Sequence, residues 1–312
     1  MATLNRVNIL GSGAIGMALA VHLLQQNREV LLIKTSQDDV SEKKITISMR
    51  TGQDNTRSVA VTMLSLSKIK DLSGIIVIAT KTYANDKIAK ELAQKNITSP
   101  LVIIQNGLGI ERPYLELDFP EIYRCILFAS SQKIQDTFVQ YKPIAPSPIG
   151  IIKGNTQTLQ RIVSNLHTPN FSFVVEHNIQ EKIWQKAIIN SVFNSICPLL
   201  EIDNGIFIRN AAVTELALEI ITECVAVASG AGIDLNIDQL QQQIQKISQA
   251  SDGQFISTLQ DLQQKRETEI TALNLEIARI ADMSTIKISI EKTRLLGKMI
   301  LLKSELGLIP DS

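Results

Sequence analysis

The sequence predicts an α/β protein, with a doubly wound sheet in its N-terminal part and an all-helical C-terminal domain. The first half of the chain alternates short apolar runs with helical stretches. A glycine-rich turn separates the first run from the first helical stretch. After about residue 176 long helical patterns follow one another, and glycine and proline become rare. Since 312 residues correspond to two domains at about 150 residues each, we expect domains over 1–175 and 176–312.

Continuous apolar runs predict four strands that are buried on both faces of a parallel sheet. These runs are 7–10, 29–33, 74–79 and 101–104. Helical spacing predicts helices over 16–26 and 83–94, between strands. From 123 to 175 the runs are shorter and β-like, so we expect them to extend the sheet and complete the first domain.

The second half predicts six helices, over 179–196, 211–228, 237–250, 254–264, 268–281 and 290–302. The most apolar of them, 211–228, carries Glu215, Glu219 and Glu223 at four-residue spacing. Three carboxylates on one helical face exclude a membrane span.

Composition narrows the class of protein. Hydrophobic residues make up 45% of the chain and charged residues 20%, which suffices for a sizeable core. The formal net charge is 0, which argues against a nucleic-acid binder. We expect no metal site, because the histidines form no HExxH pattern and the cysteines no CxxC pair. The N-terminus shows no signal peptide, so we expect a soluble cytoplasmic protein.

The glycine-rich turn, Gly11-Ser12-Gly13-Ala14-Ile15-Gly16, has the GxGxxG pattern of a Rossmann dinucleotide site. It follows a predicted strand and opens a predicted helix, as that site requires. The first glycine permits the tight turn, the second lets the backbone approach a pyrophosphate, and the third lets the helix pack on the strand. The helix N-terminus adds free N–H groups and a positive partial charge.

The end of the second predicted strand indicates which nicotinamide cofactor binds. NAD enzymes usually place an acidic residue there to hold the ribose hydroxyls. Here the residues are Lys34, Thr35 and Ser36, and no acid occurs before Asp38. A cation and two hydroxyls suit a 2′-phosphate, so the sequence favours NADP. Lys34 as an ordinary surface lysine is the alternative.

Two further segments follow predicted strands, where ligands bind in such sheets. They contain Lys81, in Ala-Thr-Lys-Thr, and Asn106, in Gln-Asn-Gly. Turn chemistry explains Asn-Gly equally well, and a solvated loop explains Lys81.

In the helical half, Lys186, Asn190 and Asn194 recur at four-residue spacing on one face of an otherwise apolar helix. Burying such a polar stripe is costly unless a partner satisfies it, and a ligand is one candidate. A solvent-facing stripe is the other. Glu269 lies at the start of a predicted helix. An acidic residue there is compatible either with a functional site or with stabilisation of the helix dipole. Nothing local distinguishes Ser257 from a surface serine.

Taken together, these motifs resemble the ketopantoate reductase (2-dehydropantoate 2-reductase) family over nearly the whole chain. The resemblance rests on the glycine motif, Lys81, the Gln-Asn-Gly segment and the Lys-x3-Asn-x3-Asn helix. It also rests on Asn204-Gly205 and on Ser257-Thr-Leu-Gln-Asp261, which leads to Arg266-Glu-Thr-Glu269.

The resemblance implies that NADPH delivers hydride to the ketone carbon of 2-dehydropantoate and gives pantoate for coenzyme A synthesis. Lys186 would match the general acid. Glu269 would match an acid that orients this lysine or the cofactor ribose, and Lys81 a cofactor-side lysine. Asn106 would match a residue near both nicotinamide and substrate. Substrate-binding positions would be Asn190, Asn194, Ser257 and, more weakly, Asn204.

The chain departs from the family pattern at four places, one of which is Lys34 or Thr35, where the family frequently has arginine after the second strand. Thr271 stands where the family often has Asp, Leu275 follows Asn274 where Gly is frequent, and Ser195 stands where Pro is usual.

A relative that reduces another branched 2-oxo acid is therefore the alternative. A catalytically silent NADP-binding regulator is a further alternative, but such a protein should have lost the acid, and Lys186, Asn106 and Glu269 all remain. Both a monomer and a homodimer are compatible with the sequence.

Overall fold

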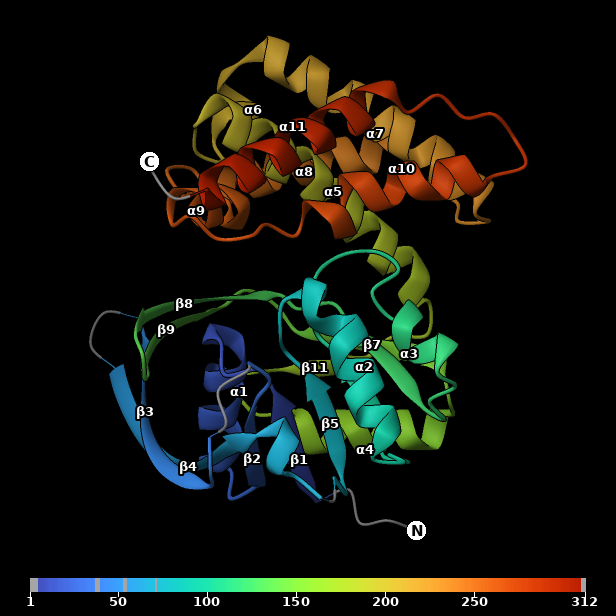
Figure 1. Cartoon of the computed structure of the whole chain (residues 1–312). Helices are drawn as coiled ribbons and strands as arrows, with labels where there is room; N and C mark the ends of the chain where they lie inside the picture. Colours follow the sequence, from blue (N-terminus) through green and yellow to red (C-terminus); the bar gives the residue numbers. More distant parts are fainter. Residues whose placement is uncertain (1–4, 37–39, 53–54, 71, 310–312) are drawn as a thin grey trace. The chain divides into compact units, whose positions relative to one another are not determined.

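The computed structural model describes residues 5–36, 40–52, 55–70 and 72–309. The chain divides into two compact units. An α/β unit comprises Met1–Gln105 and Ile110–Ile179, and a helical unit comprises Asn106–Gly109 and Gln180–Ser312. The predicted fold class is confirmed (Figure 1).

The α/β unit is built on one sheet in the order β11-β10-β7-β6-β5-β1-β2-β4-β3-β9-β8. Its central strands are parallel, namely β7 (Ile122–Cys125), β6 (Leu101–Ile103), β5 (Ile75–Ile78), β1 (Arg6–Leu10), β2 (Glu29–Lys34) and β4 (Asn55–Ser65). The chain places β2 and β4 on one side of β1, and then returns to place β5, β6 and β7 on the other side. The direction of winding therefore changes between β1 and β5, which is where ligands bind in doubly wound sheets.

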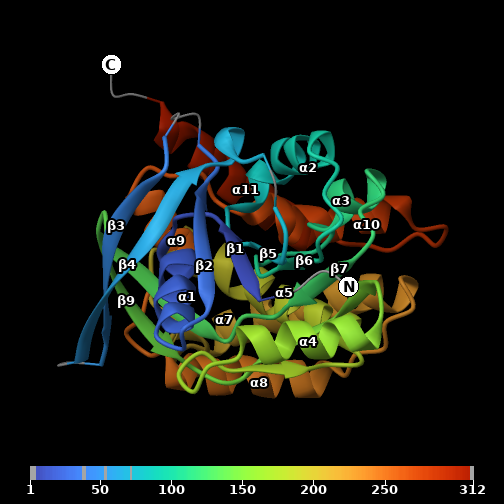
Figure 2. The ribbon, with the colours of Figure 1, turned by 90° about the horizontal axis from the view of Figure 1, so that it is seen from below.

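Helix α1 (Ala14–Leu24) is enclosed by the sheet. All its residues from Gly16 to Leu23 are buried. The reason is visible in Figures 1 and 2, where the outer strands β3 (Lys43–Thr51), β9 (Phe138–Pro143) and β8 (Ala129–Gln135) curl around it. A helix covered in this way must be apolar on nearly every side, as the sequence of α1 is apart from His22.

Two parts of the α/β unit differ from the predicted elements. Strands β3 and β4 form an antiparallel hairpin that was not predicted. Within 123–175, strands β10 (Ser147–Lys153) and β11 (Phe173–Val175) extend the sheet as expected, but α4 (Thr156–Leu166) lies between them. The β-like interpretation was wrong there, because buried Leu159, Ile162 and Leu166 recur at helical spacing. The remaining helices are α2 (Asn85–Gln94) and the short α3 (Arg112–Glu116).

The helical unit contains α5 (Ile179–Leu200), α6 (Ile206–Arg209), α7 (Ala211–Gly230), α8 (Ile237–Ala250), α9 (Ser257–Gln263), α10 (Asn274–Met283) and α11 (Glu291–Leu308). Helix α7 packs against α6, α8, α10 and α11. Among the helices of the described residues, none is both long and apolar enough to span a bilayer.

Two predicted helices are shorter than expected. The helix predicted over 254–264 begins only at Ser257, because the chain turns at Gly253, whose φ is +73°. The helix predicted over 268–281 is divided at Leu273 (φ −118°, ψ −106°) into a short 3₁₀ turn, η3 (Ile270–Ala272), and α10. Glu269 therefore precedes a 3₁₀ turn and does not open an α-helix.

Candidate active site

The glycine-rich turn lies where the winding of the sheet reverses. Gly11 has φ +120°, and a Cβ there would lie 2.7 Å from the carbonyl carbon of Ala79. A Cβ at Gly16 would lie 2.0 Å from the carbonyl oxygen of Gly11. Because both clashes involve backbone atoms, only glycine fits at these two positions.

Gly13 is different, since a Cβ there would meet no atom of the described residues within 4 Å. This exposed residue is the N-cap of α1, and the first turn of α1 carries no acidic side chain. The first N–H groups of an α-helix have no partner inside the helix and attract anions. The open space at Gly13 thus fits a diphosphate against the helix N-terminus.

The ends of two neighbouring strands flank this turn. The Gly11 N–H donates to the Ile33 carbonyl (2.9 Å), and the Ala79 N–H donates to the Leu10 carbonyl (2.8 Å). Lys34, half-buried, is the residue after Ile33, and Lys81, also half-buried, is two residues after Ala79. The structure therefore brings the glycine turn, Lys34 and Lys81 to one edge of the sheet.

A buried amide network, which the sequence did not suggest, fixes the loops after β5 and β6. The Gln105 side chain donates to the carbonyl and hydroxyl oxygens of Thr80 (2.9 and 3.1 Å) and to Asn85 Oδ1 (2.8 Å). Asn85 Nδ2 donates back to Gln105 Oε1 (3.0 Å). Burial raises the pKa of Tyr114, whose hydroxyl donates to Asn85 Oδ1. The sequence did not reveal this hydrogen-bond network, because Gln-Asn-Gly is also a common sequence in turns.

The segment Asn106–Gly109 belongs to the helical unit. The Leu108 N–H donates to the carbonyl of Ala272 (2.8 Å), which lies in the 3₁₀ turn that follows Glu269. Asn106 is half-buried, and its side chain has no hydrogen bond to any described residue. The structure thus places Asn106 and Glu269 on two segments that contact each other.

The polar stripe of α5 divides into residues with different surroundings. Asn194 is buried, and its Nδ2 donates to the Asn190 carbonyl (2.9 Å). Its Oδ1 accepts from Thr258 Oγ1 (2.7 Å), and more weakly from the Thr258 N–H and Ser257 Oγ (both 3.4 Å). Asn194 therefore caps the N-terminus of α9 from a different helix.

Asn190 and Lys186 are only half-buried. Within the described part of the chain, the Asn190 side chain has no hydrogen-bond partner. The structure thus brings Asn190, Asn194 and Ser257 together, with Lys186 one helical turn before Asn190. Thr258 joins this group, and nothing in the sequence distinguished it from its neighbours.

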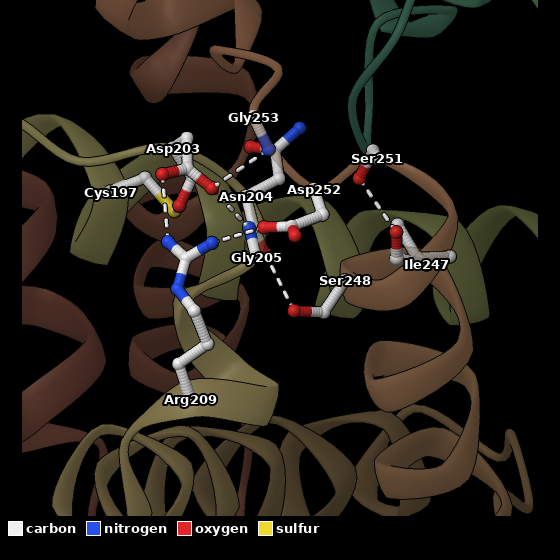
Figure 3. Close-up of polar contacts among 10 residues, drawn as sticks. All are labelled: Cys197, Asp203, Asn204, Gly205, Arg209, Ile247, Ser248, Ser251, Asp252 and Gly253. Carbon is white, nitrogen blue, oxygen red and sulfur yellow. Dashed lines mark hydrogen bonds and ion pairs between the residues drawn. The ribbon is translucent and has the colours of Figure 1, made fainter.

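Asn204 lies in a separate cluster between α5 and α6 (Figure 3). Its N–H donates to the Gln254 carbonyl (2.9 Å), and its carbonyl accepts from Ser248 Oγ (2.7 Å). Its buried Oδ1 has no partner among the described residues. Asn204 is thus hydrogen-bonded to α8 and to the turn before Ser257. It does not share the hydrogen bonds that join Asn190 and Asn194 to the start of α9.

A cluster of charged side chains holds the turn before Ser257. Asp203 Oδ1 accepts from the N–H groups of Gly205 (2.8 Å) and Gly253 (3.1 Å). The Arg209 guanidinium bonds to Asp203 Oδ2 (2.7 Å) and to Asp252, and it holds the pKa of Asp203 well below its usual range (Figure 3). These ion pairs and hydrogen bonds fix the turn that leads into Ser257.

No group of three or more His, Cys, Asp or Glu side chains in the described ranges could hold a metal ion. The three cysteines are buried free thiols. Burial raises the pKa of both Cys197 and Cys224 to about 12, so neither is a thiolate near neutral pH.

Two family models match the chain in order. The model described as ketopantoate reductase PanE/ApbA matches residues 7–147, and that of its C-terminal domain matches residues 178–299. The chain belongs to the ketopantoate reductase family. The resemblance inferred from the motifs is thereby confirmed, and the family is one of oxidoreductases.

Relatives of this ketopantoate reductase family member include two proteins named 2-dehydropantoate 2-reductase. The one from Pyrococcus abyssi is 26% identical over 88% of this chain and 91% of its own length. The one from Listeria innocua is 24% identical over 88% and 90%.

Solved structures share the fold. A dimeric ketopantoate reductase from Staphylococcus aureus has a TM-score of 0.80 at 21% identity, covering 97% of this chain and 99% of its own. A D-mandelate dehydrogenase with NADH and anilino(oxo)acetate has a TM-score of 0.85 at 18% identity, covering 97% and 100%.

Proposed function

We propose that this protein catalyses the NADPH-dependent reduction of 2-dehydropantoate to pantoate, a precursor for coenzyme A. The proposal rests on two features that occur together in one chain of this family. One is a glycine turn with open space at Gly13, and the other is a helix that presents Lys186 and an Asn190 whose side chain has no hydrogen-bond partner among the described residues. Curated relatives named for this reaction support the substrate.

The residues around the glycine turn fit a dinucleotide. Gly11, Ser12, Gly13, Ala14, Ile15 and Gly16 would hold the pyrophosphate through backbone N–H groups. Lys34 would bind the 2′-phosphate, assisted by Thr35 and Ser36. The related D-mandelate dehydrogenase fold was solved with NADH, so the fold alone does not select NADPH. The absence of an acid at the end of β2 is what favours it. When bound, the cofactor supplies the hydride.

The residues of the helical unit would act on the substrate. As the ketone carbon accepts hydride, its oxygen gains the electron pair of the C=O bond, and Lys186 Nζ donates the proton that completes the hydroxyl. Asn190 and Ser257 would hold the carboxylate and hydroxyl groups, together with Asn194. Asn204, which lies in the separate cluster of Figure 3, would be a weaker member of the substrate-binding set. Asn106 and Glu269 would face both cofactor and substrate, and Glu269 would orient the lysine or the ribose. Lys81 would lie on the cofactor side.

A second candidate is the reduction of another branched 2-oxo acid. The observation that favours it is Leu275, which stands where the family frequently has glycine. A Cβ at Gly297 would lie 2.9 Å from Leu275 Cδ2, so the larger side chain packs into room that a glycine of α11 provides. The replacement of the family's glycine by Leu275 alters the segment that follows Glu269 and η3.

A panel of 2-oxo acids separates the candidates. The loss of NADPH absorbance is followed with 2-dehydropantoate, with the same acid lacking its hydroxyl, and with an aryl 2-oxo acid. We expect the highest kcat/KM with 2-dehydropantoate. A tenfold preference for the branched acid without the hydroxyl would establish the second candidate. A tenfold preference for the aryl acid, or no turnover with any acid, would contradict both.

A further inference from the structure

One buried asparagine holds both ends of the segment Asn106–Gly109. Asn85 is the first residue of α2, and only 3% of it is exposed. Its Nδ2 donates to Gln105 Oε1 and to the Ile110 carbonyl, both at 3.0 Å. Gln105 and Ile110 are the residues immediately before and after the segment. A single side-chain amide therefore fixes the chain on either side of it.

The hydrogen-bonding capacity of this amide is fully used. In addition to the two bonds that Nδ2 donates, Asn85 Oδ1 accepts from Gln105 Nε2 (2.8 Å) and from the Tyr114 hydroxyl (3.4 Å). An asparagine side chain offers two N–H donors and an oxygen with two lone pairs. Turning this buried amide would leave polar atoms without partners, which is costly. Asn85 is thus a fixed point for both ends of the segment.

The place of Asn106 depends on how these ends are held. Gly107 and Gly109 have φ +112° and +63°, in the region that favours glycine, so the segment is built on its two most adaptable residues. The Asn106 side chain has no hydrogen bond to any described residue. The bond from the Leu108 N–H to the Ala272 carbonyl fixes the middle of the segment, but not its start.

We propose that Asn85 is a positioning residue for the reduction and that it acts through Asn106. This inference rests on the proposed function, in which Asn106 faces both cofactor and substrate. A side chain that acts on a substrate must be held within about 0.5 Å of its productive place. A misplacement of about 1 Å can cost roughly a hundredfold in rate. Loss of the Asn85 amide would release the backbone next to Asn106 and at Ile110 together.

A double-mutant cycle of Asn85→Ala and Asn106→Ala tests this inference. The measured quantity is kcat with saturating NADPH and 2-dehydropantoate. We expect Asn106→Ala to lower kcat, and Asn85→Ala to lower it roughly ten- to a hundredfold. In the Asn106→Ala background, Asn85→Ala should have little further effect, because the side chain that it positions is already absent.

Tyr114→Phe is the matched control. It removes the longest bond to the Asn85 amide but leaves both ends of the segment held, so kcat should not change. Asn85→Asp is a second variant that keeps the size and the acceptor of the side chain. Its carboxylate cannot donate to Gln105 or Ile110, so we expect a loss of kcat similar to that of Asn85→Ala, whether or not the alanine variant folds.

Hydrogen–deuterium exchange of the peptide that contains residues 105–110 gives a readout that does not require turnover. Exchange should be faster in the Asn85 variants than in the wild type and in Tyr114→Phe, because the ends of the segment are released. Thermal unfolding shows that each variant is folded at the assay temperature.

A folded Asn85 variant with the kcat of the wild type would overturn the inference, as would losses that simply add in the double variant. If Asn106→Ala keeps the kcat of the wild type, the role proposed for Asn106 fails and this inference fails with it. A wild type that reduces none of the 2-oxo acids contradicts the proposed function instead. Unaltered exchange in the Asn85 variants would then overturn the anchoring itself.

Discussion

The Thr258 hydroxyl donates a 2.7 Å hydrogen bond to Oδ1 of Asn194, and both residues are buried. This bond joins the start of α9 to the polar stripe of α5. It gives Asn194 a structural task that Asn190, one turn earlier, does not have. The two asparagines of the stripe should therefore respond differently to substitution.

Asn194→Ala should lower the free energy of unfolding by about 1–3 kcal/mol, because it leaves the Thr258 hydroxyl and N–H buried without an acceptor. Asn190→Ala should change it by less than about 0.5 kcal/mol. Both should raise KM for the 2-oxo acid. Urea unfolding and steady-state kinetics measure the two effects. Equal stability of the two variants would contradict the capping role.

The glycine turn offers a second matched pair. Gly16→Ala should destabilise the protein by about 2–4 kcal/mol or prevent folding, since the new Cβ meets the backbone of Gly11. Gly13→Ala has open space, so we expect a cost below about 1 kcal/mol but NADPH binding weakened at least tenfold, roughly 1.4 kcal/mol. Thermal unfolding and fluorescence titration separate folding from binding. Unimpaired NADPH binding by the Gly13 variant would show that the cofactor does not approach this turn.

Lys34→Ala tests cofactor selection. Loss of a charge-assisted contact to the 2′-phosphate should weaken NADPH roughly ten- to a hundredfold and leave NADH unchanged. Lys44→Ala, a change at an exposed lysine of β3, is the control. Equal affinities of the wild type for the two cofactors would refute the selection argument, as would an unaltered preference in Lys34→Ala.

His22 makes stability depend on pH. Burial, together with the positive charge of Arg57, lowers its pKa from 6.5 to about 4, and its Nε2 has no partner among the described residues. Below pH 6.5 the unfolded chain binds a proton that the folded chain excludes until about pH 4. The free energy of unfolding should therefore fall as pH falls through this window, by about 2 kcal/mol at pH 5.

Chemical denaturation at pH 7 and pH 5 measures this loss. His22→Leu, which keeps an apolar contact with the rings of Tyr141 and Phe171, should remove most of it. The same pH dependence in the variant would assign the effect to other groups.

Much of the fold follows from local patterns in the sequence. The strands around the glycine turn are continuous apolar runs, and helix α8 has the bounds that its periodicity predicts. One prediction was wrong where a distant contact accompanies a turn, whereas α4 was missed although its own helical spacing is present in the sequence. The helix predicted over 254–264 begins only at Ser257, after a turn in which Asp203, some fifty positions away, accepts the Gly253 N–H.

The candidate site was predictable as a set of residues but not as a set of contacts. Spacing placed Lys186, Asn190 and Asn194 on one face, since four residues are close to one helical turn. Spacing cannot reveal that Asn194 is bonded to Thr258, because that bond joins residues 64 positions apart. The grouping of Asn106 with the helical unit depends likewise on the bond from Leu108 to Ala272.

We propose that Lys186 protonates the oxygen of a 2-oxo acid as NADPH reduces it. The most direct measurement is kcat of Lys186→Ala with saturating NADPH and 2-dehydropantoate, in protein shown to be folded and to bind NADPH as the wild type does. We expect kcat to fall about 10²–10⁴-fold. A kcat close to that of the wild type would mean that the proton comes from another group, and it would contradict the proposed role of Lys186.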